Sequence, residues 1–218
     1  MIDINVIALD VGSLLNIGWW RDSASHDPTS GRDLDSLVDA VGADLLAGTA
    51  VALGFEAPLF IPLPSAHVGL NRQRVGESGR PWCAGAGTGA LALGIQQSAY
   101  VFSALAQRLR PRVTFDPAAL LSGEADLLVW EAFVSGKAKN RAAVDPHIDD
   151  ARLAVLEFRS RLSTSTVTSD INESMVLNLV AAGLIASRLA TDPLLLRTAC
   201  VVVAPPPFVT GSPKALSQ

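Results

Sequence analysis

The sequence predicts an α/β domain with a mixed central sheet, an N-terminal antiparallel hairpin and helices on both faces of the sheet. Three observations predict this class. An apolar run at residues 4–9 is followed, after a short turn, by the strand-like run "NIGWWRD", as in a hairpin. Later apolar runs alternate with segments of helical periodicity, which favours helices layered on a sheet. The hydrophobic content of 49% is enough for a large core.

The first half of the chain contains two further elements after the hairpin. Apolar residues recur at helical spacing over residues 33–48, and Gly48 ends the pattern. The run "AVALGFEAPLF", residues 50–60, is typical of a buried strand. Residues 61–89 are rich in Pro, Gly and Arg and predict a long ordered insertion, and a loop of this length is typically functional or mobile.

The second half predicts two strands and three helices. We expect a helix over 90–109, a strand over 125–134 and an amphipathic helix over 149–162. Residues 172–189 are apolar nearly all round, which predicts a deeply buried helix. A last strand is expected in "ACVVVAPPP". Residues 1–207 therefore read as one domain, and 208–218 read as a loose C-terminal tail.

Charge and composition narrow the classes of function. The net charge of −4 and the pI of about 5.3 argue against a protein that coats nucleic acid. Cys83 and Cys200 form no C-x-x-C pair, so a zinc site or a disulfide framework is not expected. No apolar stretch reaches the roughly 18 residues of a membrane span, and the N-terminus lacks signal-peptide features. We therefore expect a cytoplasmic protein with no membrane partner, and a homo-oligomer is left open.

Acidic residues fall near the ends of three predicted strands. Asp10 ends the first strand, Glu56 lies in the run that precedes Pro58, and Glu131 lies near the end of "LLVWE". If these strands are neighbours, their acids converge at the sheet edge where open α/β sheets bind ligands. A helix then begins at "HIDDAR", which contains His147, Asp149 and Asp150, and we expect Asp149 to cap this helix.

Converging carboxylates repel one another unless a cation lies among them. Magnesium takes oxygen ligands, and paired divalent ions can activate water in phosphodiester cleavage. The alternative treats each acid separately: Asp10 would accept backbone N–H bonds in its own turn, and Glu56 would pair with an arginine. The shared position at strand ends favours a magnesium or manganese site that includes Asp10 and Glu56.

Several motifs in order along the chain resemble a known fold. They are "ALDVG", "GFEAPLFIP", "NRQRVGESGRPW", "VWEAFVSGKAK" and the final helix that leads into "VVVAPPP". Together, over most of residues 4–207, they resemble an uncharacterised family of predicted RNase H-like nucleases. The resemblance implies that Asp10 is the first metal-binding acid, that Glu56 stands where the family usually has Asp, and that Glu131 is the acid of the fifth strand.

The resemblance leaves the last acid of the site open. "HIDDA" is similar to the H-x-x-D helix start of some Holliday-junction resolvases, which would make His147 and Asp150 ligands. "VLNLVAAGLIA" is similar to the family's Asp-Ala helix, in which Asn178 would replace the acid. We predict that Asp150 points at the site and that Asn178 is buried against the sheet.

The sequence thus predicts a divalent-metal-dependent nuclease or phosphodiesterase of RNase H-like type. Its catalytic residues would be Asp10, Glu56, Glu131 and Asp150, and its substrate a nucleic acid or small phosphoester bound weakly and locally. Basic residues beside the acids are candidate phosphate contacts. These are Arg72, Arg74, Lys137 and Lys139. The alternatives are a catalytically weakened relative that binds a nucleotide, metabolite or protein, and an ATPase domain of the actin and sugar-kinase type.

Overall fold

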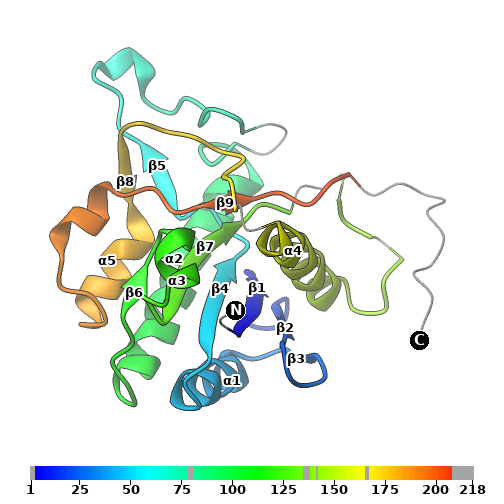
Figure 1. Ribbon diagram of the computed structural model, residues 1–218. Coiled ribbons are helices and arrows are strands. Elements are labelled where there is room, and N and C mark those ends of the chain that lie inside the picture. The colour runs from blue at the N-terminus through cyan, green and yellow to red at the C-terminus, as the bar shows by residue number, and fades with distance from the viewer. Residues whose placement is uncertain (1–2, 78–80, 135–137, 141, 165–166, 208–218) are drawn as a thin grey trace.

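A mixed β-sheet organises the chain, as the computed structural model shows for residues 3–77, 81–134, 138–140, 142–164 and 167–207 (Figure 1). Within these residues the sheet has seven strands: β1 (Ile4–Asp10), β2 (Gly18–Asp22), β3 (Thr29–Gly31), β4 (Ala50–Phe55), β6 (Val113–Thr114), β7 (Leu127–Ala132) and β9 (Val202–Val203). The strand order is β3-β2-β1-β4-β7-β6. β6 pairs with the first two residues of β7, and β9 pairs with its last two residues. β1 is antiparallel to β2 and parallel to β4, which is parallel to β7. The predicted hairpin and mixed sheet are therefore confirmed.

The three central strands are buried along their whole length. Every residue of β1, β4 and β7 is buried, which agrees with their nearly continuous apolar sequences. Parallel strands are covered on both faces and so need apolar side chains in both directions. The polar exceptions in these strands therefore need a specific partner.

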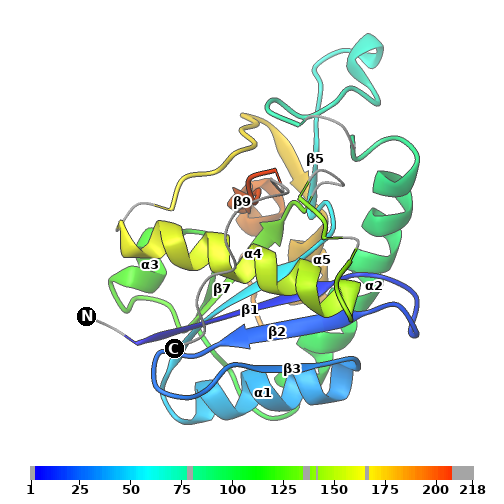
Figure 2. The ribbon, with the colours of Figure 1, turned by 90° about the vertical axis from the view of Figure 1, so that its right-hand side faces the viewer.

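Helices cover both faces of the sheet. One face packs against α1 (Leu34–Leu46), α2 (Ala86–Ala106) and α5 (Leu179–Ala186), and its core includes Ile7 and Leu9. The other face packs against α4 (Pro146–Ser163) and against Leu120 of α3 (Pro117–Leu121). Figure 2 shows α4 lying across β1 and β2, and α4 makes its main sheet contacts with these strands. Successive residues of β1 thus belong to two separate cores.

Two predicted elements are wrong in part, because a segment of each forms a second, two-stranded sheet. β4 ends at Phe55, and Phe60 begins a separate strand, β5 (Phe60–Pro62). β5 pairs antiparallel with β8 (Val176–Asn178), in the first half of the segment predicted as one buried helix. Pairing with β5 overrides the helical tendency of these residues, and the helix α5 begins only after Asn178.

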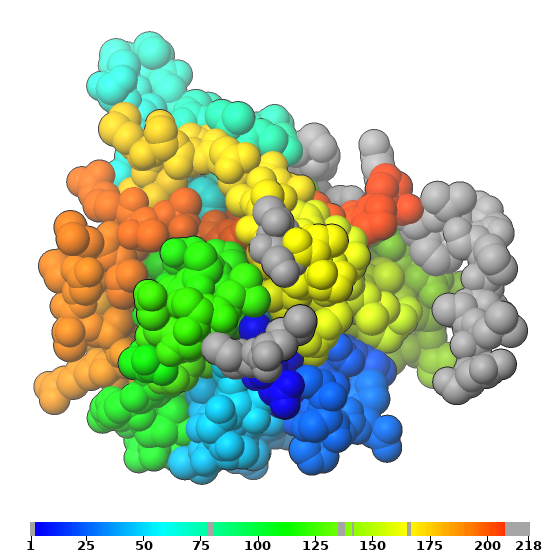
Figure 3. Space-filling model, in the orientation of Figure 1, coloured from blue at the N-terminus to red at the C-terminus, as the bar shows by residue number. Residues whose placement is uncertain are grey.

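The insertion predicted over residues 61–89 contains the rest of β5, a 3-10 turn at His67–Gly69 and the first residues of α2. Its cyan segment stands out from the body of the molecule in Figure 3. Two arginines fasten it. Arg72 forms a bidentate ion pair with Glu173, and the buried Arg74 forms an ion pair with Glu131 of β7. The insertion is therefore attached to the domain by ion pairs as well as by its two ends.

Several other boundaries differ from the prediction. α2 begins at Ala86 because the left-handed Gly85, with φ 53°, ends the preceding turn. The final strand is confined to β9, and a 3-10 helix, Pro193–Arg197, precedes it. The predicted tail, 208–218, lies outside the described residues. None of the described helices is long and apolar enough to cross a membrane.

Candidate metal centre

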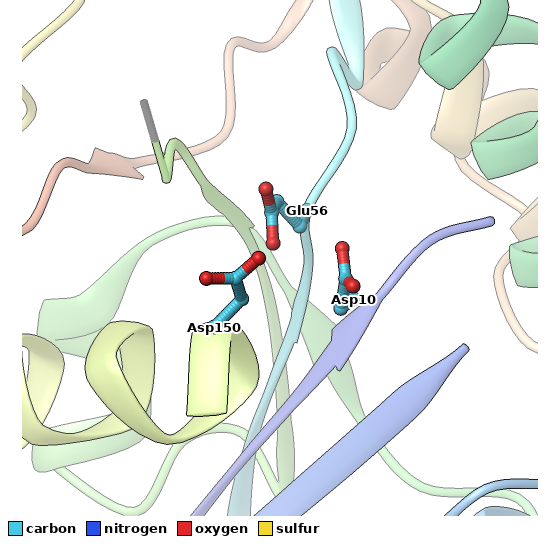
Figure 4. Close-up of side chains that lie close together, drawn as sticks. All are labelled: Asp10, Glu56 and Asp150. Atoms are coloured by element: carbon cyan, nitrogen blue, oxygen red, sulfur yellow. The ribbon is translucent and has the colours of Figure 1, made fainter. Parts of the chain in front are cut away.

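Three carboxylates converge at the carboxyl end of β1 and β4 (Figure 4). Asp10 is the last residue of β1, and Glu56 directly follows β4. The two strands are parallel, with Leu9 opposite Phe55, so the acids leave the sheet side by side. Asp150 reaches the same point from α4. One carboxylate oxygen from each residue lies within 4.8 Å of the other two. The predicted meeting of Asp10 with Glu56, and of Asp150 with both, is confirmed.

Gly18 allows α4 to approach the end of β1. It pairs with Asp10 across the β1–β2 hairpin, and the backbone of His147 and Ile148 lies directly on it. A Cβ atom at Gly18 would lie 2.5 Å from the nitrogen of Ile148, too close for any side chain. The first turn of α4 can therefore sit against Asp10 only because this strand position is glycine.

The N-terminus of α4 is fixed by Asp145 rather than by Asp149. The Asp145 carboxylate accepts hydrogen bonds from the backbone nitrogens of His147 and Ile148, at 3.1 and 3.2 Å. Pro146 occupies the first turn, where its missing N–H costs nothing. The prediction that Asp149 caps the helix is wrong, because Asp149 lies inside the helix and accepts from Arg152 at 2.7 Å.

Each acid of the cluster has a basic neighbour. The Nδ1 atom of His147 lies 2.5 Å from Oδ2 of Asp10. The ammonium of Lys139 lies 3.0 Å from Oε1 of Glu56 and also contacts Oδ2 of Asp150. The second oxygen of Glu56, Oε2, is buried and has no hydrogen-bond partner among the described residues. One lysine thus contacts two of the three carboxylates, and His147 contacts the third.

Burial and mutual repulsion shift the ionisation of the cluster. Burial, followed by the negative charge of Asp10, raises the pKa of Glu56 well above its ordinary value. Burial also raises the pKa of Asp150, although Lys139 opposes this shift. Burial lowers the pKa of Lys139, but the charges of Glu56 and Asp10 outweigh it and raise the pKa above the ordinary lysine value. Glu56 and Asp150 are therefore harder to ionise than ordinary carboxyl groups.

Glu131 does not join the cluster, which corrects the prediction that it is a catalytic residue of this site. Its neighbour on the same face of β7, Val129, packs in the core with Leu9, whereas Asp10 belongs to the alternate face of β1. The Glu131 side chain is fully buried and forms a bidentate pair with Arg74, at 2.6 and 2.7 Å. It also accepts from the backbone nitrogen of Leu59 at 2.9 Å. Glu131 therefore has a structural partner for each oxygen.

The described candidate phosphate contacts are all engaged within the protein. The Arg74 side chain has no exposed surface and also pairs with Glu77 at 2.9 Å, so it cannot reach a phosphate. Arg72 is held by Glu173 at 2.6 Å, although 39% of its side chain is exposed. Lys139 faces the acids, and Lys137 lies outside the described residues. Residues 137–141 follow the strand of Glu131 in the sequence, but the pairing of Lys139 with the acids was not predicted.

Asn178 is buried away from the three acids, as predicted. Its side-chain oxygen accepts from the backbone nitrogen of Ala181 at 3.0 Å and caps α5. Its amide nitrogen donates to the carbonyl of Thr198 at 2.7 Å. The structure thus brings Asp150, and not Asn178, to Asp10 and Glu56. His147 also lies at this site, where it contacts Asp10.

Comparison of the chain with protein-family models, with curated proteins and with solved structures finds no match in any of the three. The case for a function therefore rests on the residues and their geometry.

Proposed function

We propose that this chain is a divalent-metal-dependent phosphodiester hydrolase, a nuclease or phosphodiesterase of RNase H-like architecture. The observation that carries the proposal is the convergence of Asp10, Glu56 and Asp150 from two parallel strands and a helix. The mixed sheet with an antiparallel N-terminal hairpin agrees with the architecture that the sequence resemblance implies.

The chemistry of the cluster fits a hard divalent cation. All three ligand groups are carboxylates, the oxygen donors that magnesium and manganese prefer. Three ionised acids carry three negative charges against the single positive charge of Lys139, so the cluster has a net negative charge that attracts a divalent cation. The unpartnered, buried Oε2 of Glu56 supplies a further acceptor that the described protein groups leave unsatisfied.

The residues at the site would have different roles in holding the metal ion. Asp10, Glu56 and Asp150 would hold Mg²⁺ or Mn²⁺, which when bound supplies Lewis acidity that activates water and neutralises charge on a phosphodiester. His147 contacts Asp10 and would fix the direction of its carboxylate, as residues behind metal ligands commonly do. Gly18 keeps the start of α4 against Asp10, so that Asp150 stays in reach.

The test is a cleavage assay with purified protein on single-stranded, duplex and branched DNA, on RNA, and on a small phosphodiester. Cleavage should require Mg²⁺ or Mn²⁺ and stop with EDTA. Asp10→Asn should keep the fold but lose most of the rate, because it removes a ligand charge at nearly constant volume. Glu157→Gln is the matched control, because it neutralises a carboxylate of α4 that pairs with Arg161 instead.

The outcomes separate the proposal from its alternatives. Equal activity in wild type and Asp10→Asn would identify a contaminating nuclease. Metal binding without cleavage of any substrate would favour a binding protein that retains the site. Cleavage should weaken as salt rises, because salt opposes the counterion release that accompanies each phosphate contact. Substrate binding should also be weak, because this acidic chain has few basic groups that can contact phosphates.

A further inference from the structure

The ammonium of Lys139 lies among the acids of the proposed metal site. Nζ is 3.0 Å from Oε1 of Glu56 and contacts Oδ2 of Asp150, and only 23% of the side chain is exposed. Asp10 has a separate partner in His147. Lys139 is therefore the group that links the two acids of the cluster that come from β4 and α4.

These contacts place the ammonium against two of the three carboxylates that would hold a metal ion. The ligand oxygens of the three acids lie within 4.8 Å of one another, so an ion bound by all of them would sit close to both Glu56 and Asp150. Two cations held by the same pair of carboxylates repel each other strongly in a partly buried site. A lysine side chain is flexible and can withdraw its charge, whereas the carboxylates are carried by strand ends and a capped helix.

We infer that Lys139 is a place-holding cation, which neutralises the acids in the metal-free protein and is displaced when a divalent ion binds. This inference rests on the proposed function, because it concerns the same three carboxylates. It gives Lys139 a positioning role before metal binds. The displaced ammonium would remain tethered beside the site, where a phosphoester is a suitable next partner.

The first experiment follows the amine itself in the wild-type protein. The sequence contains three lysines, Lys137, Lys139 and Lys214, so the other two serve as internal references. An amine-acylating succinimidyl ester is applied in EDTA and in saturating Mn²⁺, and mass spectrometry with fragmentation gives the modification of each lysine. The ratio of Lys139 to Lys214 should rise several-fold with Mn²⁺, because the released amine leaves the carboxylates that contact it and becomes more accessible to the reagent.

The second experiment measures Mn²⁺ affinity directly, from the spin-resonance signal of free Mn²⁺. Lys139→Met should bind Mn²⁺ at least about ten-fold more tightly than wild type, because the ion no longer competes with an internal cation. Lys139→Arg keeps the charge and should stay near wild type. Arg112→Gln removes an exposed cation paired with Asp126, and should also leave the affinity unchanged.

The results distinguish the inference from the function on which it rests. Tighter binding by Lys139→Met alone, with increased labelling of Lys139 in Mn²⁺, supports displacement. Mn²⁺ binding with equal affinity in wild type and Lys139→Met, together with unchanged labelling, overturns the inference and leaves the metal site intact. If no variant binds Mn²⁺ or Mg²⁺, both the inference and the proposed function are wrong. The labelling is done on wild type, so the test holds even if Lys139→Met does not fold.

Discussion

Replacing Arg74 with Met should destabilise the protein severely without touching the proposed metal site. The guanidinium donates to Glu131 at 2.6 and 2.7 Å and to Glu77 at 2.9 Å, and all three side chains are fully buried. It also lies over the Phe60 ring, 4.8 Å from its centre. Arg74→Met keeps the length of the side chain but leaves two carboxylates buried without their cation.

The size of the effect follows from this geometry. Removing one partner of a buried ion pair costs about 3–5 kcal/mol. For a chain of this length, 1 kcal/mol corresponds to roughly 2–4 °C in Tm, so the loss should be roughly 6–20 °C. The backbone nitrogens of Leu59 and Trp82 still donate to Glu131 and Glu77, but neutral donors cannot compensate two charges.

The assay is urea and thermal unfolding in EDTA at neutral pH, followed by tryptophan fluorescence. The triple variant Arg74→Met, Glu77→Gln, Glu131→Gln should lose less stability than Arg74→Met alone, because it leaves no unpaired charge. A loss below about 1 kcal/mol for Arg74→Met, or a larger loss for the triple variant, would refute the reasoning. Mn²⁺ affinity of the folded Glu131→Gln protein should equal that of wild type, since Glu131 lies outside the cluster.

Three further predictions concern the site and its supports. Asn178→Ala should cost about 1–3 kcal/mol in urea unfolding, because it removes the buried cap of α5, while Asp150→Asn should instead weaken Mn²⁺ binding. Burial and Asp10 raise the pKa of Glu56, so its protonated form favours the folded state, and this stability is lost as pH rises through the raised pKa. The melting temperature in EDTA should therefore fall as the pH rises above the usual carboxyl range, and it should fall by less in Glu56→Gln than in wild type. Gly18→Ala should weaken Mn²⁺ binding, because the new Cβ pushes the first turn of α4 off β2; unchanged affinity would show that this approach does not position Asp150.

The sequence by itself determined the elements whose signals are local. The apolar runs predicted β1, β4 and β7, and the short turn between the first run and "NIGWWRD" predicted the hairpin of β1 and β2. Two of these runs stop at an acid, Asp10 and Glu56. Parallel neighbours deliver such residues to the same edge, so their meeting could be predicted before any coordinates were known.

Only the tertiary structure determined on which face of the sheet each acidic side chain lies and with which group it pairs. Glu131 resembles the other acids in sequence, but strand pairing sets its register and turns it to the opposite face, where Arg74, 57 residues earlier, neutralises it. Likewise, the local sequence does not separate Asp150 from Asn178, since each lies near the N-terminal end of a helix. Packing of α4 on Gly18 brings Asp150 to the site, and pairing of β8 with β5 buries Asn178 elsewhere. Such long-range contacts depend on the whole fold, because charge pairing and side-chain direction are fixed only when distant segments pack together.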